Sequence, residues 1–455
     1  MNPQQKKLRY TYWLVSAFVK KNAQAILLSF LLSIIGVISF VSFSPYLFSL
    51  FTTQTTKIGI SGLYTAETLP DDITSKFSNG MLYVGDNGEL IPLLAESWEE
   101  VDGGKEYRYH LKKDLSWNDG KPFTAKDIKY NFTDVNVEAQ NEYLLVFKLK
   151  KPLAIFPTFL AKPVIKKPLV GVAGLYTVDK VKAEAGFIRE LQLTPNKDDL
   201  PILIYKFYDT ETKLIQAYKL GEITEMQTNK ANTAEQFKSW KNTVVEEQVD
   251  YTKVMTLFYN FSDGLIKEEK DLRHAIAMSI DKSKFEELGE NGYSPIPPVS
   301  WAHDPTSERF GYNPNLSSKL MQNYVNTDKP LELRISTYYD HLDIADEIKQ
   351  DLEAAGVTTK VEVLAANLPS NYQLFLAQMT LPKDPDQYFY WHSTQKQGNI
   401  TNYANVRVDN VLEKGRETLN ISERKEIYND FQQTLIDDMP AYFLYYPNIY
   451  TIKRK

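Results

Sequence analysis

An uncharged, mostly apolar run of 21 residues, from Ala23 to Phe43, constrains this chain more than any other feature of its sequence. An α-helix rises about 1.5 Å per residue, so a helix of this length would be about 31 Å long and would match the hydrocarbon core of a bilayer. Five lysine and arginine residues precede the run, and the first acidic residue of the chain is Glu67. Because positive charge favours the cytoplasmic side, we expect a single-pass protein of the cell membrane with a cytoplasmic N-terminus and a periplasmic or extracellular folded part.

A cleaved signal peptide is the alternative interpretation of the same run. The run is long for a signal peptide, and the segment VSFSPYLFSLF at its end offers no clear A-x-A cleavage site. We therefore expect an uncleaved anchor. A lipid-modified lipoprotein anchor is excluded, because the chain contains no cysteine.

Size and charge limit the classes of protein to consider. A chain of 455 residues with 43% hydrophobic residues can bury a large core in two or three domains. Residues 1–66 contain six basic and no acidic residues, so residues 67–455 contain 46 basic and 58 acidic residues and carry a net charge of −12. An acidic surface repels the phosphate backbone, and we set nucleic-acid binding aside.

Local patterns predict a β-rich segment followed by alternating strands and helices. A DGG turn at 102–104 predicts a hairpin whose second strand alternates apolar and polar residues. Shortly after it, Thr124 and Asp127 match a capping box that should open a helix.

From about residue 200 the pattern indicates an α/β fold. A strand at 331–339, a helix at 340–356 and a strand at 357–364 form a plausible βαβ unit, which implies a parallel sheet. The sequence predicts further helices at 210–221, 271–288 and 422–438, and a closing strand at 441–452.

The sequence has no recognisable catalytic or metal-binding motif. The five histidines, at 110, 274, 303, 341 and 392, share no metal-like spacing. H-E-x-x-H, C-x-x-C, G-x-x-x-x-G-K-[ST] and G-x-S-x-G are all absent from the sequence. We therefore expect no catalytic residue, no cofactor and no metal site.

Two aromatic clusters are candidates for functional surfaces. One is DPDQYFYWHS at 384–393, and the other is AYFLYYPNIY at 441–450. Aromatic clusters more often belong to the core, because these side chains dominate core burial. The 29 tyrosines outnumber the 23 phenylalanines, however, and their hydroxyl groups suit a polar cleft better than a dry core.

Five motifs occur in an order that resembles the family 5 extracellular solute-binding proteins, the peptide, dipeptide and nickel binders that serve ABC importers. The similarity is collinear from residue 57 to residue 455, and five motifs in order are specific although each one alone is weak. The motifs are the segment 94–132, GVAGLY at 171–176, DLRHAIAMSIDKSKF at 271–285, KDPDQYFY at 383–390 and the tail at 402–447.

The resemblance implies a two-lobed α/β fold of the periplasmic-binding-protein type II, similar to cluster C, with a trimmed extra subdomain and one preceding transmembrane helix. The chain would cross between the lobes near 259–261 and again near 442–446. The implied divisions are a cytoplasmic segment 1–22, an anchor helix 23–44, a linker 45–56, lobe I from 57–78, 165–258 and 441–455, a small subdomain 79–164 within lobe I, and lobe II 259–440.

The resemblance also implies a ligand cleft that closes by hinge motion and holds an extended peptide through its main chain. Replacing Tyr445 and Asn260 by alanine should then weaken ligand binding and leave thermal stability within a few degrees. The ligand-binding residues that the resemblance implies are Tyr259, Asn260, Gln378, Met379, Leu381, Tyr388, Trp391, Tyr445 and Tyr446.

Two features depart from the family pattern. Leu381 stands where peptide-binding relatives place an aspartate that pairs with the amino terminus of the peptide. A buried ammonium without a carboxylate costs several kcal/mol, so another acid would have to replace that aspartate. Asp384 or Asp386 could do so only if their loop is rebuilt. The short connection within 129–149 indicates that the small subdomain is trimmed.

The leading interpretation is a membrane-anchored binding component of an ABC importer for oligopeptides or dipeptides, attached through residues 23–44. Its partners would be two permease subunits and two ATPase subunits. A ligand-binding sensor or adaptor with the same clamp, and an importer subunit for a sugar or a metal chelate, are the alternatives. An extracellular hydrolase has the least support, because no nucleophile and base pair can be identified in the sequence.

Overall fold

The computed structural model describes residues 3–51, 54–85, 87–307, 309–325, 330–365, 367 and 371–455, apart from the side chains of residues 3–8 and 42–51. The chain forms two compact units. The first comprises residues 1–56 with 197–202, and the second comprises residues 57–196 with 203–455.

The first unit consists mainly of helices α1 (Pro3–Lys21) and α2 (Ala23–Phe51). Within α2, the segment Ala23–Val41 is long and apolar enough to cross a membrane. The helix continues through residues 45–51, where we expected a linker, because the apolar sequence extends beyond Phe43. Residues 52 and 53 lie outside the described residues and β1 begins at Thr55, so the expected linker at 45–56 is wrong for most of its length.

One sheet runs through the second unit, in the order β16-β15-β17-β13-β18-β11-β1-β10-β9-β8, with β12 and β14 (Gly289–Asn291) also paired to β18. We call the part from β1 to β12, together with the end of β18, lobe I. Helix α5 confirms the helix predicted at 210–221; the Thr210 side chain caps its start, and Gly221, with φ 80°, ends it. The strands of lobe I are β1 (Thr55–Ser61), β8 (Tyr176–Glu184), β9 (Phe187–Pro195), β10 (Ile202–Tyr208), β11 (Glu225–Thr228) and β12 (Thr243–Val249), and its helices are α3 (Asp71–Phe77), α5 (Glu211–Leu220) and α6 (Ala231–Lys238).

The small subdomain of lobe I contains a four-stranded sheet in the order β4-β5-β7-β6 and the strand pair β2 (Leu82–Val84) and β3 (Leu90–Pro92). The predicted hairpin is confirmed as β4 (Ala95–Val101) and β5 (Glu106–Leu111), and the short connection that follows is the hairpin of β6 (Val135–Ala139) and β7 (Leu144–Leu149). The capping box of Thr124 and Asp127 is present, but it caps only a 3-10 turn, Ala125–Asp127. The predicted helix is wrong, because Ile128 is extended and is buried in the subdomain core.

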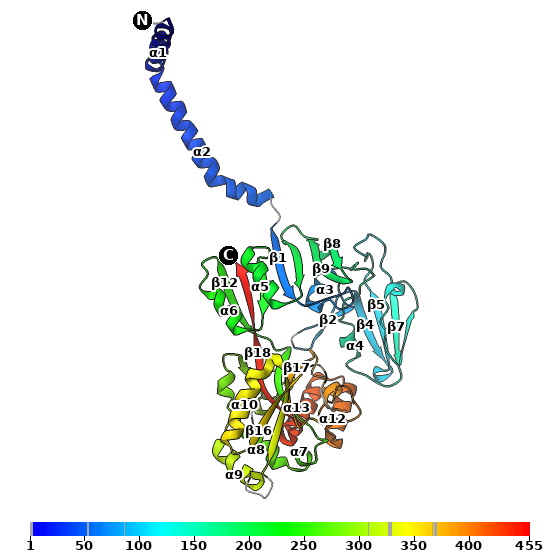
Figure 1. The fold of residues 1–455 in the computed structure, drawn as a ribbon. Helices are drawn as coiled ribbons and strands as arrows, with labels where there is room; N and C mark the ends of the chain where they lie inside the picture. Colours follow the sequence, from blue (N-terminus) through cyan, green and yellow to red (C-terminus); the bar gives the residue numbers. More distant parts are fainter. Residues whose placement is uncertain are drawn as a thin grey trace. The chain divides into compact units, whose positions relative to one another are not determined.

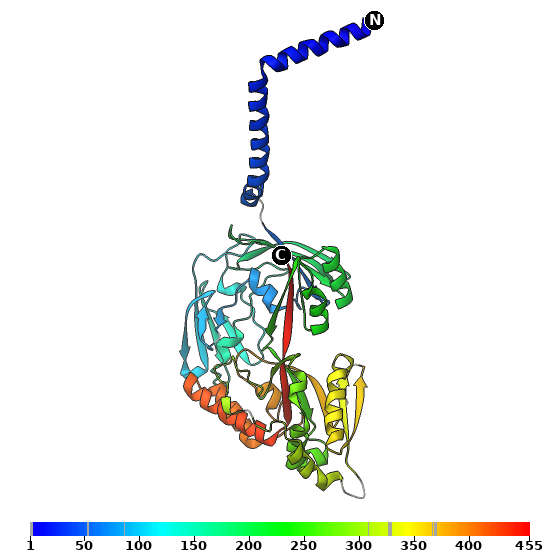
Figure 2. The same ribbon diagram turned by 90° about the vertical axis from the view of Figure 1, so that its left-hand side faces the viewer.

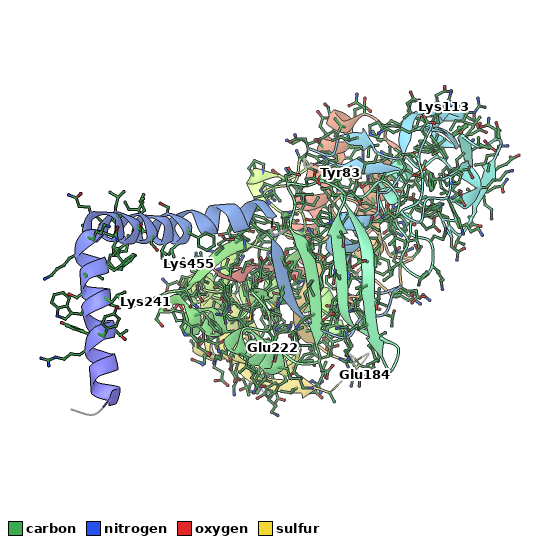
Figure 3. All side chains as sticks on the ribbon, turned by 90° about the horizontal axis from the view of Figure 1, so that it is seen from above. Tyr83, Lys113, Glu184, Glu222, Lys241 and Lys455 are labelled. Atoms are coloured by element: carbon green, nitrogen blue, oxygen red, sulfur yellow. The ribbon has the colours of Figure 1, made fainter. Side chains whose placement is uncertain are left out.

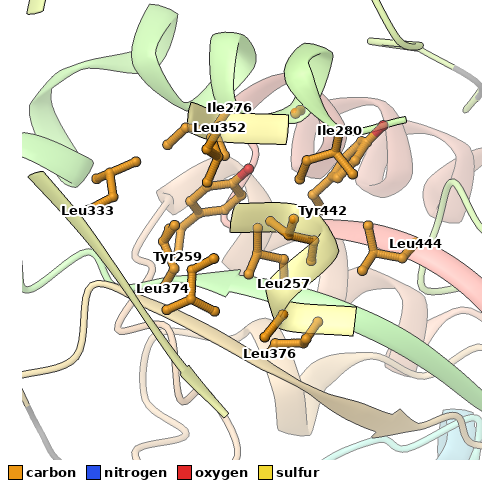
Figure 4. Packing of buried hydrophobic residues seen from close by; sticks show 14 of the residues in the cluster. Leu257, Tyr259, Ile276, Ile280, Leu333, Leu352, Leu374, Leu376, Tyr442 and Leu444 are labelled. Atoms are coloured by element: carbon orange, nitrogen blue, oxygen red, sulfur yellow. The ribbon is translucent and has the colours of Figure 1, made fainter. Parts of the chain in front are cut away.

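Lobe II is a sheet covered on both faces. Its parallel pair β15 (Glu332–Tyr338) and β16 (Thr358–Leu364) confirms the predicted βαβ unit with α10 (Leu342–Ala354) between them. Figure 1 shows α8 (Lys270–Ser279), α9 (Pro314–Val325) and α10 on one side, and α12 (Val406–Glu417) and α13 (Ile421–Asp438) on the other. The buried residues divide accordingly into two clusters, and the cluster on the α8 face surrounds the ring of Tyr259 (Figure 4).

The chain crosses between the lobes at two adjacent segments. The first crossing is residues 250–252, which join β12 to β13 (Lys253–Tyr259). The second is Pro447 within β18 (Ala441–Arg454), a strand that runs unbroken through both lobes (Figure 2). The Asp250 N–H donates to the Pro447 carbonyl O over 2.8 Å and joins the two segments. The first crossing therefore precedes β13 instead of following it near 259–261, and the second lies beside Tyr446. Pairing of β13 with β17 (Leu374–Thr380), and of Ala441–Tyr445 with β13, assigns these segments to lobe II.

Candidate ligand site on lobe II

Strand β17 has a free edge where it approaches the crossing segments. On one side β13 pairs with every residue of β17. On the other side β15 pairs only with Leu374–Leu376, so Ala377–Thr380 have no strand partner there among the described residues. Backbone N–H and C=O groups on an unpaired strand edge are a template for an added strand. An extended main chain can therefore pair at this edge.

A pocket of about 280 Å³ opens beside this edge. The ring centroids of Phe258 and Phe375 are 6.2 Å apart, and those of Phe389 and Tyr390, in α11 (Tyr388–Trp391), are 5.2 Å apart in an edge-to-face arrangement. Burial raises the pKa of Tyr390. The described residues that line the pocket are Phe258, Phe375, Ala377, Gln378, Met379, Thr380, Phe389, Tyr390, Trp391, Gln397, Gly398, Ile400 and Thr401. They include no carboxylate, ammonium, guanidinium or imidazole group, so the surface is aromatic and amide in character.

Close packing fixes the pocket wall formed by residues 397–401. A Cβ atom at Gly398 would lie 2.2 Å from the Phe389 carbonyl O, so only glycine fits this position. Thr401 Oγ1 donates to Asn399 Oδ1 over 2.8 Å, and Asn399 Nδ2 donates to the Tyr403 carbonyl O over 2.8 Å. The wall is therefore held through hydrogen bonds behind the pocket.

The two acids of the DPD segment are both paired with arginines. Arg424 Nη2 is 2.8 Å from Asp384 Oδ1, and Arg416 Nη2 is 2.7 Å from Asp386 Oδ2. Burial raises the pKa of Asp384, and Arg424 opposes that shift. Neither carboxylate is free to bind the amino terminus of a ligand in this conformation. The described residues also include no group of three or more His, Asp or Glu side chains placed to hold a metal.

Some of the expected site residues lie at the pocket. Gln378, Met379 and Trp391 line it. Leu381 follows β17 and is buried in the same hydrophobic cluster as Met379 and Trp391. Tyr388 lies between other groups: the Arg416 Cζ is 3.8 Å from the centre of its ring, and the His392 ring centroid is 4.1 Å away on a stacked plane.

The other expected residues lie in the interior of lobe II. Tyr259 is fully buried, and Tyr445 packs against Phe285 with ring centroids 5.8 Å apart. Asn260 Nδ2 donates to the Tyr372 carbonyl O over 2.7 Å, and Tyr446 Oη donates to the Ser294 carbonyl O over 2.9 Å. The structure does not bring these four residues together with the pocket, and ligand contact by them stays a prediction.

Sequence reasoning missed the phenylalanines of the pocket. The expected site residues do not include Phe258 or Phe375, and Phe389 belongs only to the aromatic cluster at 384–393. The strand pattern contained a usable signal, because successive side chains of a strand point to opposite faces. If Tyr259 faces one side of the sheet, Phe258 must face the other.

The small subdomain contacts lobe II beside the DPD segment. Lys383 Nζ donates to Tyr83 Oη over 3.3 Å and lies 4.4 Å from the centre of the Tyr83 ring. Tyr83 belongs to β2 (Leu82–Val84) and is labelled in Figure 3. The Ala154 N–H donates to the Arg416 carbonyl O over 2.6 Å. These contacts place part of lobe I next to the segment that borders the pocket.

The chain is similar to known proteins in sequence. The family model described as bacterial extracellular solute-binding proteins, family 5 Middle, matches residues 89–400. The oligopeptide-binding protein AppA of Bacillus subtilis (strain 168) is 23% identical in an alignment 467 positions long, which covers 85% of this chain and 84% of the relative. The probable D,D-dipeptide-binding periplasmic protein DdpA of Escherichia coli (strain K12) is 24% identical over 412 residues, which cover 78% of this chain and 79% of the relative.

The chain is also similar to solved structures. The structure of NikZ from Campylobacter jejuni in complex with Ni(L-His) matches with a TM-score of 0.73 at 23% identity. The match covers 89% of this chain and 94% of the NikZ chain. The structure of AppA from Bacillus subtilis in complex with a nonapeptide matches with a TM-score of 0.67 at 20% identity. The match covers 89% of this chain and 95% of the AppA chain. These likenesses identify the two-lobed α/β fold of the periplasmic-binding-protein type.

Proposed function

The chain belongs to the bacterial extracellular solute-binding proteins of family 5, which are transport binding proteins and not enzymes, and from this membership we propose that it delivers peptides to an ABC importer. The importer would supply two permease subunits and two ATPase subunits. The observation that carries the peptide class is the unpaired edge of β17 at Ala377–Thr380, with a pocket directly beside it.

An extended peptide would add to β17 as another strand. Hydrogen bonds to its main chain provide affinity that does not depend on sequence, and pockets for alternate side chains provide selectivity. The names of two relatives, an oligopeptide-binding protein and a probable D,D-dipeptide-binding protein, support the same class.

Ligand binding would shift the protein between open and closed states. The crossings at 250–252 and Pro447 are short, adjacent segments joined by a hydrogen bond, which is the arrangement of a hinge. A peptide held by both lobes favours the closed state by its difference in affinity for the two states. The closed protein is the form that we expect the permease to bind.

The helix α2 would keep the binding protein at the membrane. Its apolar segment Ala23–Val41 can span a bilayer, and the basic residues before it favour a cytoplasmic N-terminus. We propose an uncleaved, single-pass anchor. N-terminal sequencing of the protein purified from membranes tests this, and a mature protein that begins after Phe43 would contradict it.

The substrate class can be tested directly. The full-length protein is purified in mild detergent and denatured, and the released small molecules are identified by mass spectrometry. Short peptides are the expected result. A released sugar or metal chelate would contradict the peptide class but remain consistent with an importer subunit. An empty protein without any ligand-induced thermal shift would favour a sensor or adaptor.

A further inference from the structure

Resting on the proposed peptide-binding function, we propose that the pocket beside β17 selects an uncharged aromatic side chain of the bound peptide. The lining residues come from β13, β17, α11 and the segment 397–401, so the pocket belongs wholly to lobe II. It is therefore present before the lobes close, and it can choose among ligands at the first encounter.

The volume of the pocket suits one side chain. At about 280 Å³ it is smaller than the roughly 300–1,000 Å³ that is typical of sites enclosing a drug-sized ligand. The rest of a peptide must therefore lie outside it, along the strand edge. This division matches a main chain paired to β17 and one side chain inserted into lobe II.

The alternation of β17 directs such a side chain towards the pocket. Phe375, Ala377 and Met379 alternate along the strand and all belong to the cluster on the α11 face. A strand added at the free edge repeats this alternation, so every second side chain of a bound peptide points to the same face. The pocket opens on that face, beside Met379 and the rings of Phe375 and Phe258.

The chemistry of the lining favours an aromatic ring and disfavours charge. Aromatic rings prefer offset or edge-to-face neighbours, and the rings of Phe389 and Tyr390 already meet at 79°. No described lining residue could neutralise a lysine or glutamate side chain, and a buried charge without a partner is strongly disfavoured. Gln397 is exposed, and its amide offers hydrogen bonds without charge.

Binding of defined peptides by the full-length protein tests the proposal. Isothermal titration calorimetry compares tetraalanine with peptides in which Phe, Leu, Lys or Glu replaces one alanine at a time. We expect one position at which Phe lowers the Kd at least about tenfold relative to alanine, with a smaller gain for Leu and none for Lys or Glu. Peptides that bind without a preference for Phe at any position would overturn the pocket and leave the proposed function intact. If none of the peptides binds, both proposals fail.

A charge-switch variant with a matched control assigns the selectivity to this pocket. Gln397→Glu places a carboxylate at the pocket, whereas Gln395→Glu makes the same change two residues away, outside the lining. Gln397→Glu should shift the ratio of Lys to Phe affinity about fivefold or more towards Lys, and Gln395→Glu should leave it unchanged. An equal response of the two variants would overturn the assignment.

Discussion

The two faces of the lobe II sheet are built on the same strands and differ in what they leave accessible. On the α8 face, Tyr259 and Tyr445 are enclosed in a dense cluster of aliphatic side chains. On the α11 face, Phe258 borders a pocket whose other wall includes Phe389, a residue with 48% of its surface exposed. Phe258 and Tyr259 are neighbours in the sequence, and the strand turns them to opposite faces. Access from the pocket therefore separates a candidate ligand contact such as Phe258 from a core residue such as Tyr259.

The largest expected effect comes from alanine substitutions on the two faces: one should mainly lower stability, and the other should mainly weaken peptide binding. Tyr259→Ala removes a fully buried ring and should lower the free energy of unfolding by about 3–5 kcal/mol. Phe389→Ala removes a half-exposed ring and should cost about 1 kcal/mol or less, while it weakens peptide binding. Chemical denaturation and calorimetry on the full-length proteins measure both effects. A stable Tyr259→Ala protein that no longer binds ligand would reverse the comparison.

The same comparison revises what we expected from the sequence for Tyr445 and Asn260. Tyr445 is buried against Phe285, and the Asn260 side chain holds the Tyr372 carbonyl. Alanine at either position should therefore lower the melting temperature by more than a few degrees, because it leaves a cavity or an unpaired buried carbonyl. Thermal unfolding checks this, and unchanged melting with weakened binding would restore the original expectation.

Two glycine substitutions test how firmly the α11 face is built. Gly398→Ala forces a Cβ against the Phe389 carbonyl and should cost about 1–3 kcal/mol of stability, with a smaller preference for Phe-containing peptides. Gly311→Ala is the matched control on the same lobe, because a Cβ there has no neighbour within 4 Å. Equal behaviour of the two variants in unfolding and in peptide binding would show that the wall is not rigid.

The two faces should also respond differently to pH. Burial lowers the pKa of His274, on α8, below its usual value of 6.5, and burial has the same effect on His341. Below pH 6.5 the unfolded chain therefore binds more protons than the folded chain, and the free energy of unfolding should fall as the pH drops from 7 towards 5. His274→Gln should flatten this slope. None of the described residues that line the pocket titrates in this range, so the ratio of Phe-peptide to tetraalanine affinity should stay constant.

Local chemistry made much of this fold predictable. The turn at 102–104 and the end of the 210–221 helix at Gly221 each depend on a few neighbouring residues, and the βαβ unit at 331–364 follows from periodicity. The helix expected to begin at Thr124 does not form, because Ile128 is extended and packs into the subdomain core despite the capping box before it. The pocket depends on contacts between separate segments, such as Phe258 with Phe375, and the pattern within one segment does not predict which segments meet.

The smallest effect that we expect comes from acetylating the amino terminus of a bound peptide. Leu381 is apolar, and Asp384 and Asp386 are held by Arg424 and Arg416, so neither of these two described carboxylates is available to an ammonium group. Acetylation should change the Kd by less than about threefold, whereas loss of a buried charge pair would cost about thirtyfold or more.

A large loss on acetylation would mean that a carboxylate does hold the amine, and Asp386→Asn would then locate it. If that variant binds free and acetylated peptides equally, the DPD loop is rebuilt in the closed state, and the arginine pairs belong to the open state. If the free amine is still preferred, the carboxylate lies elsewhere, and lobe I becomes the place to search. Only the second result would confine the selectivity of the α11 face to the side chain that enters its pocket.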